Sequence, residues 1–250
     1  MLKRIWSILF RWQPSVDTLV ALAAGFIVLG LSAAMLPFSA SSWIAILIRD
    51  VLMIFLVGIA FPIYYIRRIG CDWQEFGLTL RKWYIFIPVS LVLTGLLLLL
   101  FLSDEPPTAG FAFNLLILQK SALIMLAGVF ETVFFYSFLR TIFYRAFGAV
   151  PAVFLAALVY SLHHIGFQPE YGKLIMVGLL YAIPFQIANS ALIIFPFYWG
   201  IGGLYDVLIQ SKVVAPIYYP GIRSIYLSVF IVAMVIWTWK KGSVKTGEKH

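Results

Sequence analysis

The chain has 250 residues, of which 63% are hydrophobic and 11% are charged. Water-soluble domains carry about 25% charged residues, so this composition excludes a soluble globular protein and predicts an all-α protein with several transmembrane helices. The net charge of +8 is typical of basic loops beside a membrane, and no nucleic-acid partner is expected.

The first predicted element is a short amphipathic helix over Leu2 to Trp12, whose basic and apolar residues are typical of a helix at the membrane surface. Apolar stretches of about 20 residues follow, the length that crosses roughly 30 Å of hydrocarbon. The sequence predicts eight such spans, near residues 15–37, 43–66, 83–103, 113–145, 150–167, 173–195, 196–211 and 221–239. The fourth is long for one upright crossing, and the seventh is short and rich in glycine.

Basic residues gather in alternate loops between these spans. They precede the first span, lie between the second and third, end the fourth and follow the last, whereas Asp104 and Glu170 lie in the opposite loops. The positive-inside rule therefore places both termini in the cytoplasm, which requires an even number of crossings. We expect a multi-pass protein of the plasma membrane, with the lipid bilayer around it.

Two ionisable residues, Glu131 and His164, lie inside apolar spans, where a charged side chain is costly, so they are the first candidates for a function. Glu131 precedes Arg145 by 14 residues, and His164 follows Val150 by 14 residues. Each side chain therefore lies about 21 Å from the cytoplasmic boundary at 1.5 Å per residue. A short turn near Gly148 makes the two spans antiparallel neighbours, so we expect the two side chains at the same level.

The helix face on which each side chain lies limits which residues can act together on one ion or one water. Tyr160 lies four residues before His164 and shares its helix face, whereas His163 is rotated by about 100°. On this reasoning the two adjacent histidines do not both ligate one ion. A buried carboxyl group beside an imidazole can act as a general base on a water. The alternative is a structural hydrogen bond from Glu131 to His164 or to Arg49 that only tightens helix packing, and the residues alone leave both open.

At these residues the sequence resembles the CAAX-protease and bacteriocin-processing type of glutamic intramembrane proteases. Helices of that family carry the motifs Glu-Glu-x-x-x-Arg, Phe-x-x-x-His and His-x-x-x-Asn. Glu131 matches the first glutamate, and Tyr160 with His164 matches the second motif. Thr132 stands in place of the second glutamate and Tyr136 in place of the arginine.

The third motif lacks its histidine, because the only histidine besides His163 and His164 is His250. The missing histidine falls near Tyr198-Trp199-Gly200, and Asp206 lies where the rest of such a motif is expected. In the family this pair is thought to stabilise the oxyanion. The donors that can substitute, by resemblance and position, are Tyr198, Tyr205, Asn189 and the backbone N–H groups of residues 200–203.

The resemblance covers roughly residues 115–210 and divides the chain into three regions. Residues 1–112 hold the amphipathic helix and the first three spans. Residues 113–211 form the core that resembles the family, and residues 212–250 hold the last span and a basic tail.

The resemblance implies an intramembrane endopeptidase that cleaves a membrane-associated protein or its C-terminal tail. The implied catalytic residues are Glu131 as base, His164 as the residue that orients the water, and Asp206; possible auxiliary residues are Tyr160, His163, Asn189 and Tyr198. No cofactor is expected. A divalent ion held by one glutamate, one histidine and one aspartate is the less favoured possibility, because two usable protein nitrogens are lacking.

Two other functions remain open. The substitutions Thr132 and Tyr136 and the missing histidine favour a catalytically inactive relative that acts as a membrane scaffold, an immunity factor or a partner-binding protein. A proton-coupled transporter that uses Glu131 is less favoured, because the sequence contains no inverted repeat.

Overall fold

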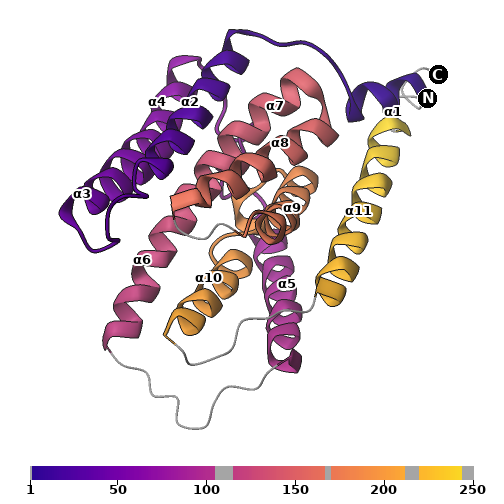
Figure 1. Cartoon of the computed structure of the whole chain (residues 1–250). Helices are drawn as coiled ribbons and strands as arrows, with labels where there is room; N and C mark the ends of the chain where they lie inside the picture. Colours follow the sequence, from indigo (N-terminus) through magenta and orange to yellow (C-terminus); the bar gives the residue numbers. More distant parts are fainter. Residues whose placement is uncertain (1, 105–114, 167–169, 212–219, 244–250) are drawn as a thin grey trace.

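The computed structural model describes residues 2–104, 115–166, 170–211 and 220–243, and every regular element within these ranges is a helix (Figure 1). The prediction of an all-α fold is confirmed. The elements in chain order are α1 (Leu2–Leu9), α2 (Val16–Ala33), α3 (Trp43–Ile46), the π-helix η1 (Leu47–Ala60), α4 (Phe61–Arg68), α5 (Trp83–Asp104), α6 (Leu115–Glu131), the π-helix η2 (Thr132–Leu139), α7 (Arg140–Phe147), α8 (Ala149–Leu162), the 3₁₀ turn η3 (His163–Gly166), α9 (Tyr171–Ala188), the 3₁₀ turn η4 (Ala191–Ile193), α10 (Phe197–Gln210) and α11 (Pro220–Ser243).

Six helical stretches of the described chain are long and apolar enough to cross a membrane, so the protein is a membrane protein with several helical spans. The third predicted span corresponds to α5 (Trp83–Asp104), and the seventh corresponds to α10, which has 14 residues. The count of eight spans and the cytoplasmic position of both termini stay predictions. The six stretches are Val16–Ala33, Trp43–Arg68, Ile117–Phe147, Ala149–Gly166, Tyr171–Ala188 and Ser224–Lys241.

A tight turn at Gly148 joins α7 to α8. Its φ of 87° lies in the left-handed region, which glycine adopts without a steric cost. The end of α1 packs directly on this turn, because a Cβ at Gly148 would lie 2.6 Å from the backbone oxygen of Leu9. The amide of Arg11 donates a 2.9 Å hydrogen bond to the carbonyl of Phe147 and so satisfies part of the C-terminus of α7.

The fourth predicted span is one continuous helical stretch made of α6, η2 and α7. The π-helical part, η2, starts directly after Glu131, and all eight of its residues are buried. A π-helical segment changes which side chains face a neighbouring helix, and such segments are frequent at functional sites. The change of helical pitch therefore falls beside the residue that is expected to carry the chemistry.

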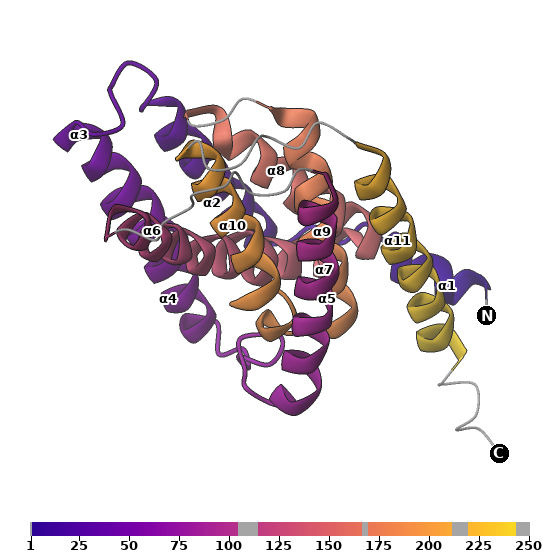
Figure 2. The ribbon, with the colours of Figure 1, turned by 90° about the horizontal axis from the view of Figure 1, so that it is seen from below.

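Helices from all three predicted regions pack together. Figure 1 shows α2 and α4 on one side of the α7–α8 pair and α11 on the other; α2 contacts α7, and α11 contacts α9 and α1. Figure 2 shows α10 between α6 and α5, and α10 contacts both. The predicted boundaries at residues 112 and 212 lie outside the described residues.

Candidate functional site

Glu131 ends α6 inside the bundle, and its residue surface is 5% exposed. Its Oε2 accepts a 2.7 Å hydrogen bond from the indole Nε1 of Trp199, which lies near the start of α10. Its Oε1 faces the two histidines of η3. The two oxygens of one carboxyl group therefore have different surroundings, an indole N–H on one side and imidazole rings on the other.

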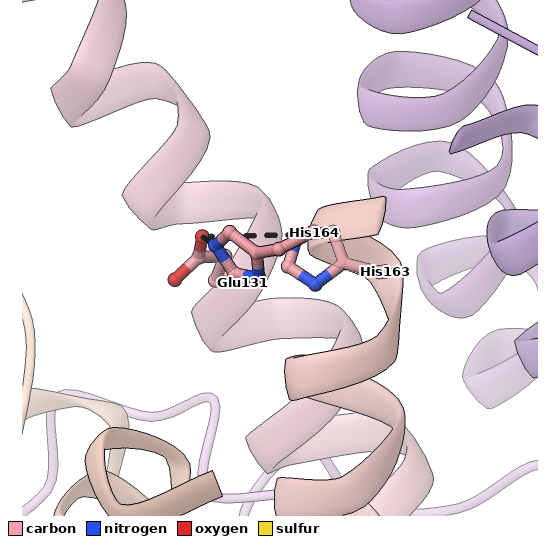
Figure 3. Close-up of side chains that lie close together, drawn as sticks. All are labelled: Glu131, His163 and His164. Carbon is pink, nitrogen blue, oxygen red and sulfur yellow. Dashed lines mark ion pairs between the residues drawn. The ribbon is translucent and has the colours of Figure 1, made fainter. Parts of the chain in front are cut away.

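Both histidines reach this carboxyl group, as Figure 3 shows. Nε2 of His164 lies 3.9 Å from Oε1 of Glu131, and Nε2 of His163 lies 4.0 Å from the same oxygen. The prediction that Glu131 and His164 lie at one level is confirmed. The expectation that His163 turns away from the acid is wrong, because its ring stands beside that of His164, with the ring centroids 3.9 Å apart.

The carbonyl oxygen of Tyr160, at the end of α8, is the common hydrogen-bond acceptor of the two histidine rings. Nδ1 of His164 lies 2.8 Å from it, and Nδ1 of His163 bonds the same oxygen. Because a carbonyl oxygen only accepts hydrogen bonds, both Nδ1 atoms donate. In a neutral imidazole Nε2 then carries the lone pair, and both Nε2 atoms lie on the side that approaches Glu131.

Helix α2 fixes η3 from the other side. The Ser32 side chain is fully buried; its Oγ donates to the carbonyl of His163 and accepts a 3.2 Å hydrogen bond from the amide of Gly166. These two bonds hold both ends of the 3₁₀ turn against α2. A serine of the first span, which carries no motif, therefore supports the position of both histidines.

Two glycines make room for the Trp199 indole beside Glu131. A Cβ at Gly128 would lie 2.5 Å from this ring, and a Cβ at Gly203 would lie 2.8 Å from it. The ring therefore occupies space that side chains on α6 and α10 would otherwise fill. Sequence reasoning did not identify Trp199 as a site residue. The available signal was its position, since it falls where the third motif lacks a histidine, and its indole N–H is a donor.

A cavity of about 150 Å³ lies beside Glu131, large enough for several water molecules. Side chains from α5, α6, α8, α9 and α10, with His164 of η3, line it. Four further residues predicted for the site, Tyr160, His164, Tyr198 and Asp206, share its wall with Glu131. Most of the predicted site is thus brought together around one hollow.

The hydroxyl of Tyr198 is buried and has no hydrogen-bond partner within the described part of the chain. Its ring packs against that of Tyr181, with centroids 5.2 Å apart. Leaving a buried hydroxyl without a partner costs about 1–3 kcal/mol, so the Tyr198 hydroxyl is a donor whose capacity the described residues do not use. Tyr136 also has a buried hydroxyl without a described partner, but Tyr136 does not line the cavity.

The carboxyl group of Asp206 also belongs to the cavity wall. One of its oxygens, Oδ2, accepts a 2.7 Å hydrogen bond from Nε2 of Gln210, one turn later on α10. Asp206 therefore places a second acid near Glu131 on a different helix.

Two polar residues that the sequence connected with the site lie elsewhere. Asn189 ends α9 in a left-handed conformation, accepts a 2.9 Å hydrogen bond from Arg140 and donates a 2.8 Å bond to the carbonyl of Gln74. It does not line the cavity and instead ties three segments together. Arg49, considered as an alternative partner of Glu131, forms its ion pair with the adjacent Asp50 at 2.6 Å.

One potential ligand atom from each of Glu131, His163 and His164 lies within 4.8 Å of the other two. The sequence-based preference against a metal ion assumed that only one nitrogen reaches the acid. This assumption is wrong, because two imidazoles approach Oε1. Three potential ligand atoms therefore lie close together at the site.

Comparisons with protein-family models, with curated proteins and with solved structures gave no match. The resemblance to intramembrane proteases therefore depends on the motif residues alone.

Proposed function

We propose that the protein is an intramembrane endopeptidase that hydrolyses a peptide bond in a membrane-associated protein or in its C-terminal tail. The observation that supports this most strongly is the 3.9 Å separation between Oε1 of Glu131 and Nε2 of His164 beside a cavity. A water with hydrogen bonds of about 2.8 Å to both atoms fits across this separation. Such a water is held between a base and an oriented imidazole.

Glu131 acts as the general base in this proposal. It takes a proton from the water while the water oxygen attacks the carbonyl carbon of the substrate peptide. The C–N bond then breaks, and the proton passes from Glu131 to the leaving amine. His164 accepts the hydrogen bond of the water's second proton, and its ring is oriented for this by the carbonyl of Tyr160.

Negative charge on the carbonyl oxygen requires a hydrogen-bond donor. The hydroxyl of Tyr198 is the donor we assign, because it is buried in the cavity wall without a described partner. A single donor of this kind contributes about 100- to 1000-fold to turnover. Asp206, on the same wall, is placed to accept hydrogen bonds from the N–H groups of a bound peptide.

The apolar part of the cavity wall favours a substrate that arrives within the bilayer. It contains Leu97 and Phe101 of α5 and Leu174 and Val177 of α9. Pockets with mostly apolar walls and a few convergent polar groups bind ligands of matching character. A transmembrane segment or a lipid-anchored tail fits this description better than a soluble peptide.

New protein termini in a membrane are the direct test. Vesicles that contain the purified protein together with the membrane protein encoded next to it are incubated, and new N-termini are labelled and identified by mass spectrometry. We expect products with the unaltered protein and with Glu170→Gln, which changes an exposed acid paired with Lys173, and none with Glu131→Gln. Equal product from Glu131→Gln would remove the support for hydrolysis by this site.

A second candidate is a catalytically inactive relative that binds a membrane partner. The specific observation that favours it is the Trp199 hydrogen bond to Glu131, which replaces the third-motif histidine by a donor that already has a partner. In the same vesicles this candidate predicts stable co-purification of the partner and no new termini from any variant. The two proposals therefore give opposite results in one experiment.

A further inference from the structure

We infer that Glu131, His163 and His164 form a binding site for one divalent transition-metal ion of the zinc class. Three acceptor atoms converge there: Oε1 of the glutamate and Nε2 of both imidazoles, which lie 3.9 and 4.0 Å from that oxygen. Lone pairs that point at a common space repel one another unless positive charge or a proton lies between them. Two imidazole nitrogens and one carboxylate oxygen are a ligand set that zinc uses in open sites.

The orientation of the rings supports a cation in particular. Histidines that bind metals donate their second ring N–H to a carbonyl or a carboxylate, which fixes the tautomer and turns the lone pair to the ion. Both histidines show this pattern here, because both Nδ1 atoms bond the carbonyl of Tyr160. The site therefore has the outer contacts of a metal site as well as the ligands.

Binding of an ion would require Glu131 Oε1 and the two histidine Nε2 atoms to move closer together. With metal–ligand bonds of about 2.0–2.1 Å in a tetrahedron, ligand atoms lie about 3.3 Å apart. The observed separations of 3.9 and 4.0 Å would thus shrink by about 0.6–0.7 Å, and the ligand atoms of the two histidines lie within 4.8 Å of each other. Trp199 holds the other carboxyl oxygen, so Glu131 presents Oε1 to the ion as a single ligand.

The ligand types select the class of ion. Imidazole suits zinc, iron, nickel and copper, whereas magnesium and calcium prefer sites built from oxygen. The cavity beside Glu131 leaves an open position for a water or a peptide oxygen. This inference rests on the geometry of the three side chains and not on the proposed hydrolysis. A bound ion would use the atoms that the proposed mechanism assigns to the water, Oε1 of Glu131 and Nε2 of His164, so the metal-binding and cleavage assays test two separate claims.

Binding of Co²⁺, which reports its coordination through visible absorption, tests the inference. The protein is prepared without a polyhistidine tag and with His250→Gln, so that no other histidine contributes. We expect one Co²⁺ per chain with the intense visible bands of a low-coordinate site, displaced by one equivalent of Zn²⁺. Loss of an outer contact of a metal site already weakens binding by about 10- to 100-fold, so His163→Ala and Glu131→Gln should weaken it at least that much.

Two comparisons keep this test decisive. Glu170→Gln, which removes an exposed acid outside the three-residue site, should bind like the unaltered chain. Circular dichroism and gel filtration of Glu131→Gln, which keeps the size of the side chain, separate loss of a ligand from loss of the fold. Absence of bound Co²⁺ in the folded, unaltered protein overturns the inference. Unchanged binding in folded Glu131→Gln and His163→Ala overturns it as well.

Discussion

Nε1 of Trp199 donates a 2.7 Å hydrogen bond to Oε2 of Glu131, and this bond joins α10 to α6 at the centre of the site. It leaves Oε1 directed at the imidazoles of η3. Trp199 thus positions the acid from the place where the resembling family has a histidine. Because the indole N–H of Trp199 is bonded to Glu131, we assign the oxyanion donor to Tyr198 instead.

Replacing Trp199 by phenylalanine removes this donor and keeps an aromatic ring in the space. We expect a loss of about 1–3 kcal/mol in the free energy of unfolding, because a buried acceptor loses its partner. Unfolding by denaturant in detergent micelles measures this loss. Trp83→Phe is the control, since Trp83 is 57% exposed, and equal stability of the two variants would show that the bond contributes little.

Gly128→Ala tests the space that the indole occupies. The added Cβ would lie 2.5 Å from the Trp199 ring, and overpacking of this kind costs about 1–3 kcal/mol. Gly95→Ala is the matched control, because no atom lies within 4 Å of a Cβ there and alanine favours a helix over glycine. Thermal unfolding of both variants should show a decrease for the first and none for the second. A stable Gly128→Ala protein contradicts the tight packing of Trp199.

Tyr198→Phe separates turnover from stability. Its hydroxyl has no partner in the described residues, so its removal should leave the melting temperature unchanged or slightly raised. Turnover should fall by about 100- to 1000-fold with little change in KM, because the donor acts on the oxyanion. Tyr136→Phe is the control, since its hydroxyl is equally unpartnered among the described residues but lies outside the cavity. Equal rates in the two variants would exclude Tyr198 as the donor.

Ser32→Ala tests the support of η3 by α2. Loss of the hydroxyl leaves the carbonyl of His163 and the amide of Gly166 without this partner, and each orphaned buried group costs about 1–3 kcal/mol. We expect lower stability together with weaker Co²⁺ binding in the absorption assay. Ser228→Ala, on an exposed face of α11, should change neither quantity. Unaltered Co²⁺ affinity in Ser32→Ala would mean that α2 does not set the histidine positions.

Counting along the helices was sufficient to place Glu131 beside His164, because antiparallel neighbours joined by a tight turn keep their levels. The same reasoning misplaced His163. It treated the rings as fixed by helical rotation, whereas the carbonyl oxygen of Tyr160 at the end of α8 accepts hydrogen bonds from both Nδ1 atoms. A carbonyl oxygen shared by two side chains at a helix end is a local feature that helical periodicity does not predict.

The residues on other helices were harder to predict for a different reason. Trp199 reaches Glu131 because Gly128 and Gly203 leave space for its ring. This contact depends on how the helices pack, and a search for a histidine motif does not detect it. Asn189 was named as a possible auxiliary residue by resemblance and position, yet its partners are Arg140 and the backbone at Gln74. Polar residues in apolar helices require partners, and their identity depends on the packing of distant segments.

The rate of peptide cleavage under single-turnover conditions tests the central claim most directly. Once a substrate is identified by its new termini, the rates of the unaltered protein, Glu131→Gln and His164→Ala are measured in the same vesicles. The account predicts decreases of about 100- to 10,000-fold for His164→Ala and complete loss for Glu131→Gln, with both variants folded. Cleavage by Glu131→Gln at the rate of the unaltered protein would contradict it.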